Sequence, residues 1–186
     1  MPRLILLNGP PGIGKSTVAR RFVDEHPLAL NLDLDAVRSM LGRWFEHQER
    51  SGTLARSLGL AMARVHLREG HDVVVPQLLA RVTFIEALER LAREVAAEFH
   101  EIVLLDAKEN AIWRFHARSQ ERSDAGHPDA AGDMIEGSGG AEALEAVYDR
   151  LVGVLEPRKQ AVVITAREGE VDATYAELLR ELRIEH

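Results

Sequence analysis

A glycine-rich loop close to the N-terminus constrains this chain more than any other feature of its 186 residues. Residues 9–16 read GPPGIGKS and match the pattern G-x-x-x-x-G-K-[ST]. The apolar run at residues 3–8 predicts a buried strand before the loop, and residues 16–25 have the periodicity of a helix after it. This strand and helix give the loop the context that the pattern requires.

The residue types in this loop suit a nucleotide phosphate. Backbone N–H groups of such a loop converge on the β-phosphate, and glycine is needed where a Cβ would block that approach or where φ must be positive. Lys15 can reach the β- and γ-phosphate oxygens, the Ser16 hydroxyl can bind Mg²⁺, and Thr17 would lie near the α-phosphate. The predicted ligand is ATP with Mg²⁺, and the predicted binding residues are Gly9, Gly12, Ile13, Gly14, Lys15, Ser16 and Thr17.

The rest of the chain alternates apolar runs with helical patterns. Further strands are predicted at residues 29–32, 71–76, 101–105 and 161–165, and helices at 83–99, 110–120, 141–155 and 171–182. Five strands alternating with helices indicate an α/β fold, in which helices cover both faces of a parallel sheet. The carboxyl ends of the strands, and any ligand, then lie along one edge. We expect one domain over residues 1–186.

Two more helices are predicted between the second and third strands. Asp35 is a plausible N-cap for a helix that starts near residue 36. Thr53 can cap the other helix, which Gly70 is placed to terminate. The apolar residues on one face of this second helix are Leu54, Leu58, Ala61 and Val65.

The aspartates after the second strand are candidates for chemistry. A kinase benefits from a carboxylate that orients the acceptor hydroxyl and takes its proton, and Asp35 is our candidate. Asp33 could hold a Mg²⁺-bound water or share the acceptor contact, and Arg38 could bind an anionic or polar acceptor. The alternative is structural: Asp35 only caps a helix, Asp33 is a solvated turn residue and Arg38 is a surface charge.

The third strand departs from the usual pattern, because it ends in Pro76 and Gln77, where many P-loop NTPases have an acid that helps to hold Mg²⁺. Either Asp33 takes over the metal contact through water, or the chain has lost efficient catalysis. Gln77 could contact the acceptor or a Mg²⁺ water, or be a plain polar strand end.

With the phosphate loop, the D-x-D of Asp33 and Asp35, the R-x-x-x-R of Arg114 and Arg118, and the final strand and helix, the chain resembles the P-loop kinase superfamily. Its members of the shikimate kinase and gluconate kinase type and of the chloramphenicol phosphotransferase and tunicamycin-resistance type are the most similar. The resemblance implies a three-layer P-loop NTPase fold with a five-stranded parallel sheet in the order 2-3-1-4-5 and a lid. It also implies that Asp35 is the acceptor-binding base and that Asp33 lies near the Mg²⁺ shell.

The predicted lid is the polar, glycine-rich segment of residues 119–140. Arg114 and Arg118 lie one helical turn apart just before it, and the resemblance implies that they stabilise the transferring phosphoryl group or pack on adenine. Arg118 is our candidate catalytic arginine, with Arg122 second. The alternatives are a solvated arginine face and an acceptor-binding insertion in place of a lid.

Composition narrows the choice of partners. A formal net charge of −7 argues against a nucleic-acid binder, which normally carries a basic face. The apolar run near the N-terminus is too short for a membrane span or a secretory signal, and the chain has no cysteine, so we expect a cytoplasmic protein without disulfides. The oligomeric state stays open.

The leading interpretation is an ATP-dependent phosphotransferase that moves the γ-phosphate to a hydroxyl of a small molecule, either a metabolite or an antibiotic. One alternative is a nucleotide-binding switch or ATPase without such an acceptor, which the missing acid after the third strand favours. A nucleic-acid end kinase is a weaker alternative because of the net negative charge.

Overall fold

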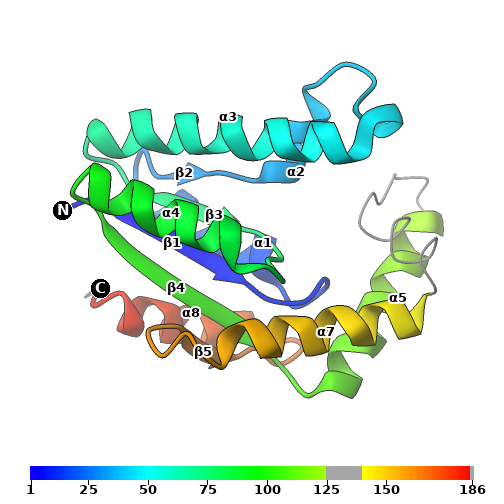
Figure 1. Cartoon of the computed structure of the whole chain (residues 1–186). Helices are drawn as coiled ribbons and strands as arrows, with labels where there is room; N and C mark the ends of the chain where they lie inside the picture. Colours follow the sequence, from blue (N-terminus) through cyan, green and yellow to red (C-terminus); the bar gives the residue numbers. More distant parts are fainter. Residues whose placement is uncertain (125–139, 185–186) are drawn as a thin grey trace.

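The computed structural model describes residues 1–124 and 140–184, without the side chains of residues 118–124 and 141. One parallel sheet has the strand order β2-β3-β1-β4-β5, which confirms the expected order (Figure 1). The strands are β1 (Arg3–Asn8), β2 (Leu30–Asn31), β3 (Val73–Pro76), β4 (Glu98–Leu105) and β5 (Val162–Thr165).

Helices cover both faces of the sheet, as predicted. They are α1 (Lys15–Glu25), α2 (Leu34–Ser39), α3 (Gln48–Arg68), α4 (Val82–Glu94), α5 (Lys108–Asp124), α7 (Ala141–Leu155) and α8 (Val171–Glu181), with a 3-10 turn η1 (Trp44–His47). Helices α1 and α8 share a core cluster with one face, while α2, α3 and α4 share a cluster with the other. Within residues 1–124 and 140–184, no helix is long and apolar enough to cross a membrane.

Strand β1 lies at the centre of the sheet, and its sequence explains why. Its residues Leu4 to Leu7 are all fully buried. Leu4 and Leu6 pack in the α3 and α4 cluster, whereas Ile5 and Leu7 pack in the α1 and α8 cluster. A strand covered on both faces reads as a continuous apolar run, and this places the loop after β1 at the middle of the carboxyl edge.

The helix starts between β2 and β3 differ from the prediction. Asp33, not Asp35, is the N-cap of α2: its Oδ1 accepts hydrogen bonds from the backbone N–H groups of Asp35, at 2.8 Å, and Ala36, at 3.3 Å. Thr53 is not a cap either, because α3 begins at Gln48 and the Thr53 hydroxyl donates to the Glu49 carbonyl within the helix. Asp35 and Thr53 were predicted as caps because their residue types favour that position. Both helices, however, begin before these residues.

Helix α3 also turns an unexpected face to the core. Leu54, Leu58, Ala61 and Val65 do share one face, but all four are exposed. The buried residues of α3 are small for most of its length: Ser51, Ala55, Gly59, Ala63 and Leu67. Small residues let α3 lie close to α2, and a Cβ added to Gly59 would lie 2.5 Å from Leu34 Cδ2. Close packing has therefore outweighed side-chain hydrophobicity here.

Two other boundaries were misplaced. The helix predicted over residues 83–99 ends at Glu94, because Ala96 adopts a left-handed φ of 56° and the chain turns into β4. Strand β4 begins at Glu98, not at residue 101, since Phe99 and His100 pair with Leu4 and Ile5. Helix α5 continues to Asp124 into the predicted lid, and residues 125–139 of that lid lie outside the described residues.

A buried ion pair crosses from β4 to the turn before β5. The Arg158 Nε donates to both carboxylate oxygens of Glu101, at 2.9 and 2.6 Å, and its Nη2 is 3.4 Å from Glu89 Oε2 on α4. Burial raises the pKa of the Glu101 carboxyl, and the Arg158 guanidinium opposes that change. Removal of one partner from such a pair typically costs about 3–5 kcal/mol, because it leaves a buried charge uncompensated.

Both tyrosines of the chain should resist ionisation in the folded protein. Burial raises the pKa of Tyr148, and the Asp106 charge adds to this effect, while burial and the Glu25 carboxylate raise the pKa of Tyr175. An exposed tyrosine titrates near about pH 10. The unfolded chain therefore loses these protons first as the pH rises, so their contribution to stability is complete below about pH 10 and declines above it.

We expect the phenolate absorbance of the native protein to rise only well above the midpoint measured in denaturant, and Tyr148→Phe to assign the two steps. A native midpoint equal to the denatured one for Tyr175 would contradict its buried position against α1.

Candidate functional site

The loop after β1 has the backbone that phosphate binding requires. Gly9 can carry no side chain, because a Cβ there would lie 2.4 Å from the Leu104 carbonyl oxygen at the end of β4. Gly14, which precedes α1, has a φ of 104°, and a Cβ there would meet no described atom within 4 Å. The start of α1 therefore faces open space, where its N–H groups and positive end suit an anion.

Lys15 holds the loop in its present conformation. Its Nζ donates hydrogen bonds to the carbonyl oxygens of Gly9 and Pro10, both at 2.8 Å. The ammonium group thus lies across the loop opening that a phosphate would enter. A bound nucleotide would offer phosphate oxygens to the same group, and a charged acceptor makes a stronger hydrogen bond than a carbonyl. The glycines, the helix end and Lys15 fit the phosphates of ATP.

Ser16 and Thr17 follow in the first turn of α1, and both are exposed. They line a shallow surface depression that continues along α1 past Arg20 and Arg21. The Ser16 hydroxyl can therefore reach solvent or a ligand beside the loop, as a Mg²⁺ ligand must. Ile13, by contrast, is buried in the α1 and α8 cluster and offers only its backbone.

Asn8, the last residue of β1, is a site residue that the sequence analysis missed. It is fully buried, and its Oδ1 accepts hydrogen bonds from the backbone N–H groups of Gly9, at 2.9 Å, and Leu79, at 2.8 Å. Its Nδ2 donates to the Leu79 carbonyl at 3.0 Å. One side chain thus fixes the start of the phosphate loop to the segment after β3. The sequence did contain a signal for this residue, because Asn8 is a polar residue at the end of an apolar run.

The sheet order sets the separation between the phosphate loop and the two aspartates. Strand β3 lies between β1 and β2, so the ends of β1 and β2 are two strand spacings, or about 10 Å, apart. Asp33 and Asp35 follow β2 and belong to the start of α2. Asp33 uses one oxygen for the cap, while Asp35 lies exposed in the first turn.

Arg38 is bonded within its own part of the chain. Its Nε donates to Ser51 Oγ at 2.9 Å, its Nη2 donates to the Gln48 carbonyl at 2.7 Å, and the guanidinium lies 4.9 Å from the centre of the Trp44 ring. These contacts tie α2 to η1 and to the start of α3. Acceptor binding by Arg38 stays a prediction, but the structure already gives this side chain a positioning function.

Gln77 lies where β3 ends, between the phosphate loop and the aspartates in the sheet order. Its backbone N–H donates to the Leu7 carbonyl at 3.1 Å. Its Oε1 is buried and has no hydrogen-bond partner among the described residues. Since most buried polar atoms are hydrogen-bonded, an unpaired acceptor at this edge fits a donor from a ligand, such as a hydroxyl or a metal-bound water.

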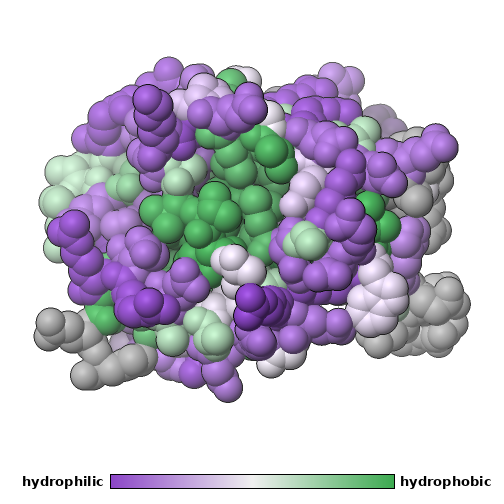
Figure 2. Space-filling view, turned by 90° about the horizontal axis from the view of Figure 1, so that it is seen from below, coloured by the Kyte–Doolittle hydropathy of each residue, from purple (hydrophilic) through white to green (hydrophobic). Residues whose placement is uncertain are grey.

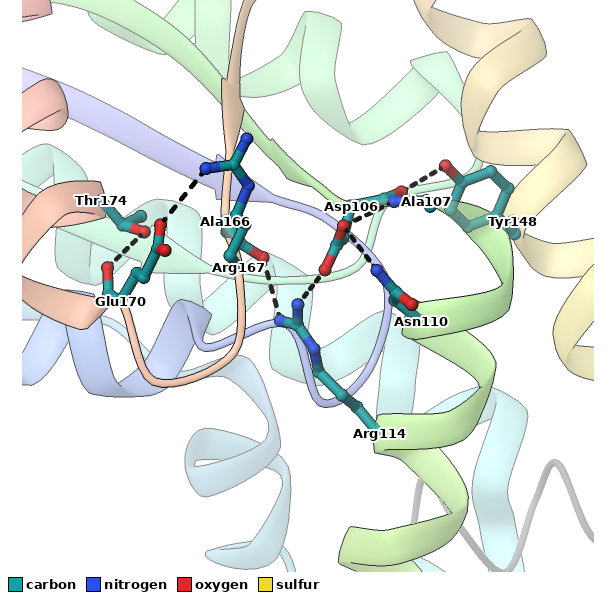
Figure 3. Close-up of polar contacts among 9 residues, drawn as sticks. All are labelled: Asp106, Ala107, Asn110, Arg114, Tyr148, Ala166, Arg167, Glu170 and Thr174. Carbon is teal, nitrogen blue, oxygen red and sulfur yellow. Dashed lines mark hydrogen bonds and ion pairs between the residues drawn. The ribbon is translucent and has the colours of Figure 1, made fainter.

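Asp106, which follows β4, organises the other side of the phosphate loop (Figure 3). Its carboxylate accepts from Arg114 Nη2 and, at 3.1 Å, from Asn110 Nδ2, and its carbonyl accepts from the Tyr148 hydroxyl at 2.8 Å. Arg114 Nη1 also donates to the Ala166 carbonyl after β5, at 2.9 Å. The network joins the ends of β4 and β5 to α5 and α7.

This network also decides where Arg114 lies. The predicted lid arginine is only 9% exposed and points toward Asp106, while its Nε has no partner among the described residues. A Cβ at Gly12 would lie 3.4 Å from the backbone of Arg114 and Phe115, so α5 packs directly on the phosphate loop. Arg118 belongs to α5, but its side chain lies outside the described residues, and the nucleotide contacts of both arginines stay predictions.

These features define a P-loop nucleotide-binding site at the carboxyl edge of a parallel sheet. The family model described as an AAA domain matches residues 4–135. This match covers well over half of the chain and includes the phosphate loop, both aspartates and α5, so the chain belongs to that family. The comparison with curated protein sequences finds no match.

Solved structures share the fold across nearly the whole chain. The tunicamycin resistance protein of Deinococcus radiodurans superposes with a TM-score of 0.64 at 17% identity, covering 100% of this chain and 98% of that one. A gluconokinase from Sinorhizobium meliloti gives a TM-score of 0.58 at 17% identity, covering 98% and 95%. The PezAT toxin–antitoxin system of Streptococcus pneumoniae gives 0.63 at 17% identity, covering 89% and 68%. These structures confirm the fold that the resemblance to the P-loop kinase superfamily implied.

The Asn8 contacts generate a prediction for the site. Asn8→Ala leaves the part-buried N–H and C=O of Leu79 without their partner, which we expect to lower the free energy of unfolding by about 2 kcal/mol. Binding of a fluorescent ATP analogue should also weaken, because Gly9 loses its anchor. Chemical denaturation and fluorescence titration measure the two effects.

Asn110→Ala is the matched control. Its amide makes one exposed hydrogen bond to Asp106, so we expect a change within about 0.5 kcal/mol. Equal effects of the two substitutions on nucleotide binding would show that Asn8 has no special part in holding the loop.

Proposed function

We propose that this protein transfers the γ-phosphate of ATP to a hydroxyl group of a small molecule. The observation that carries the proposal is the pairing of a complete phosphate loop with two aspartates about 10 Å away along the same sheet edge. A hydrolase needs only a water beside the γ-phosphate, whereas this separation leaves space for an organic acceptor.

Each residue has a proposed part in the transfer. The loop N–H groups and the start of α1 bind the β-phosphate, and Lys15 moves from its loop carbonyls to the phosphate oxygens. Asp35 orients the acceptor hydroxyl and takes its proton. The structural support for this choice is that Asp33 already serves as the helix cap, so capping does not account for Asp35.

Magnesium would be held by Ser16 and the phosphates, with Asp33 reaching it through water. The second Asp33 oxygen is not used by the cap, which leaves it available for that contact. Gln77 occupies the strand end where an acid is common, and its unpaired Oε1 is a proposed acceptor for the substrate hydroxyl or a Mg²⁺ water.

Phosphate transfer from labelled ATP to a panel of sugars, nucleosides and hydroxylated antibiotics tests the proposal. Once an acceptor is found, Asp35→Asn should lower kcat by about 10²- to 10⁴-fold, because it removes the base while keeping the side-chain volume. Affinity for an ATP analogue should stay nearly unchanged. Lys15→Met should instead lose activity together with nucleotide binding.

Asp24→Asn is the control, because Asp24 is an exposed acid near the other end of α1. It should leave transfer unchanged. Turnover that persists in Asp35→Asn would remove Asp35 from the mechanism. If ATP binds but no acceptor in the panel is labelled, and hydrolysis depends on a protein partner, the nucleotide-switch alternative replaces the kinase.

A further inference from the structure

Helix α3 carries an apolar stripe on its solvent side. Leu54 is 47% exposed, Leu58 44% and Val65 64%, with the exposed Ala61 between them. The spacings of four, three and four residues make a heptad-like seam about 17 Å long. No element among the described residues packs on this seam, although the opposite side of α3 is buried against α2 and the sheet.

The stripe has a symmetry of its own. A two-fold rotation about an axis level with the midpoint between Gly59 and Leu60 brings residue 54 to the level of residue 65, and residue 58 to the level of residue 61. Two copies of α3 packed antiparallel about a two-fold axis would therefore stack Leu54 on Val65 and Leu58 on Ala61, twice over. An isologous contact requires this kind of self-complementary surface.

We propose that the solvent face of α3 is a homodimer interface, in which α3 packs antiparallel on α3 of a second copy. The geometry matches the shallow crossing that coiled-coil-like helix pairs adopt. It is independent of the phosphotransfer proposed above.

Charges beside the seam agree with a second copy as the occupant. In an antiparallel pair, each flank of the seam faces the same flank of its partner helix. On one flank Ser57 then faces Arg64, so no two like charges meet there, while Ala55 on the other side of the seam is buried within its own chain. Arg64 is moreover neutralised within its own chain by Glu94, at 2.6 Å. A seam selected for an acidic or basic partner would carry charge at these positions.

The apolar surface continues past the seam. The His66 Nε2 of α3 is 2.7 Å from the carbonyl oxygen of Leu28, so Leu28, which is 68% exposed, lies beside the C-terminal half of the helix. Met62 is also exposed, on the flank of the seam. These exposed apolar side chains are far fewer than the roughly 20–30 residues per partner of a standard interface. We therefore expect a dimer that dissociates on dilution.

A second exposed apolar area is an alternative candidate for the homodimer interface. Figure 2 shows hydrophobic residues gathered at the centre of the underside, the face on which α7, α8 and β5 lie in Figure 1. Val152 of α7 and Val163 of β5 are exposed hydrophobic residues of these elements, at 39% and 52%. Val152→Glu therefore serves as a matched helix-surface control on α7.

Sedimentation equilibrium of the full chain tests the proposal through complementary charges. Leu54→Glu and Val65→Lys should each weaken dimerisation at least about tenfold, because each places two charges against apolar partners. An equimolar mixture of the two variants should recover the dimer, since the introduced carboxylate of one copy then faces the introduced ammonium of the other. The two positions are too far apart for this pairing to occur within one helix.

Circular dichroism should show that both variants keep the fold, because the substituted side chains are exposed. A wild-type chain that stays monomeric at submillimolar concentration would overturn the proposal and leave the face to another protein or a lipid surface. Dimers that survive Leu54→Glu, or that Val152→Glu dissociates instead, would also overturn it. Failure of the mixture to recover, after both single variants dissociate, would rule out the antiparallel packing.

Discussion

The backbone contact between Gly9 and the end of β4 is the constraint on which the site depends. A Cβ at position 9 would lie only 2.4 Å from the Leu104 carbonyl oxygen. The residue that follows β1 must therefore be glycine. That turn brings the loop over the middle of the sheet, where Asn8 fixes one side of it to the segment after β3. Glycine conformation and a single buried amide thus place the start of α1 where its N–H groups are available.

The two sides of the phosphate loop are held by different kinds of interaction. Toward β2, short-range capping and the Arg38 contacts hold α2 beside η1 and α3. Toward β5, the buried Asp106–Arg114 pair joins two strand ends to α5. A buried pair of this kind tolerates little rearrangement, because displacement of one partner strands the other charge.

The sequence predicted the parts of this protein that follow from local patterns. The phosphate loop was recognisable because residue types, spacing and flanking elements agreed, and β1 was recognisable from its continuous apolar run. The α2 cap was assigned to the wrong aspartate, because Asp33 and Asp35 have equal capping propensity and only the position of Leu34 in the core decides between them.

The remaining features depend on contacts between distant segments. Nothing local in α3 indicates that Ala55 and Gly59 are buried while Leu54 and Leu58 are exposed, since that choice is made by how closely α2 approaches. The pairing of Asp106 with Arg114 was missed for a related reason. Arg114 was interpreted with Arg118 as a nucleotide contact, and only the fold brings it under the end of β4.

The small inner face of α3 has a consequence for the position of Asp35. Helix α2 rests on Ala55 and Gly59 and is tied to the start of α3 through Arg38, so the position of Asp35 is set by the spacing of two helices. A larger residue at Gly59 would push Leu34 and so displace the start of α2, which carries Asp35. Under the proposed function, a substitution on the inner face of α3 could thus change the space for an acceptor without altering any residue that meets the nucleotide.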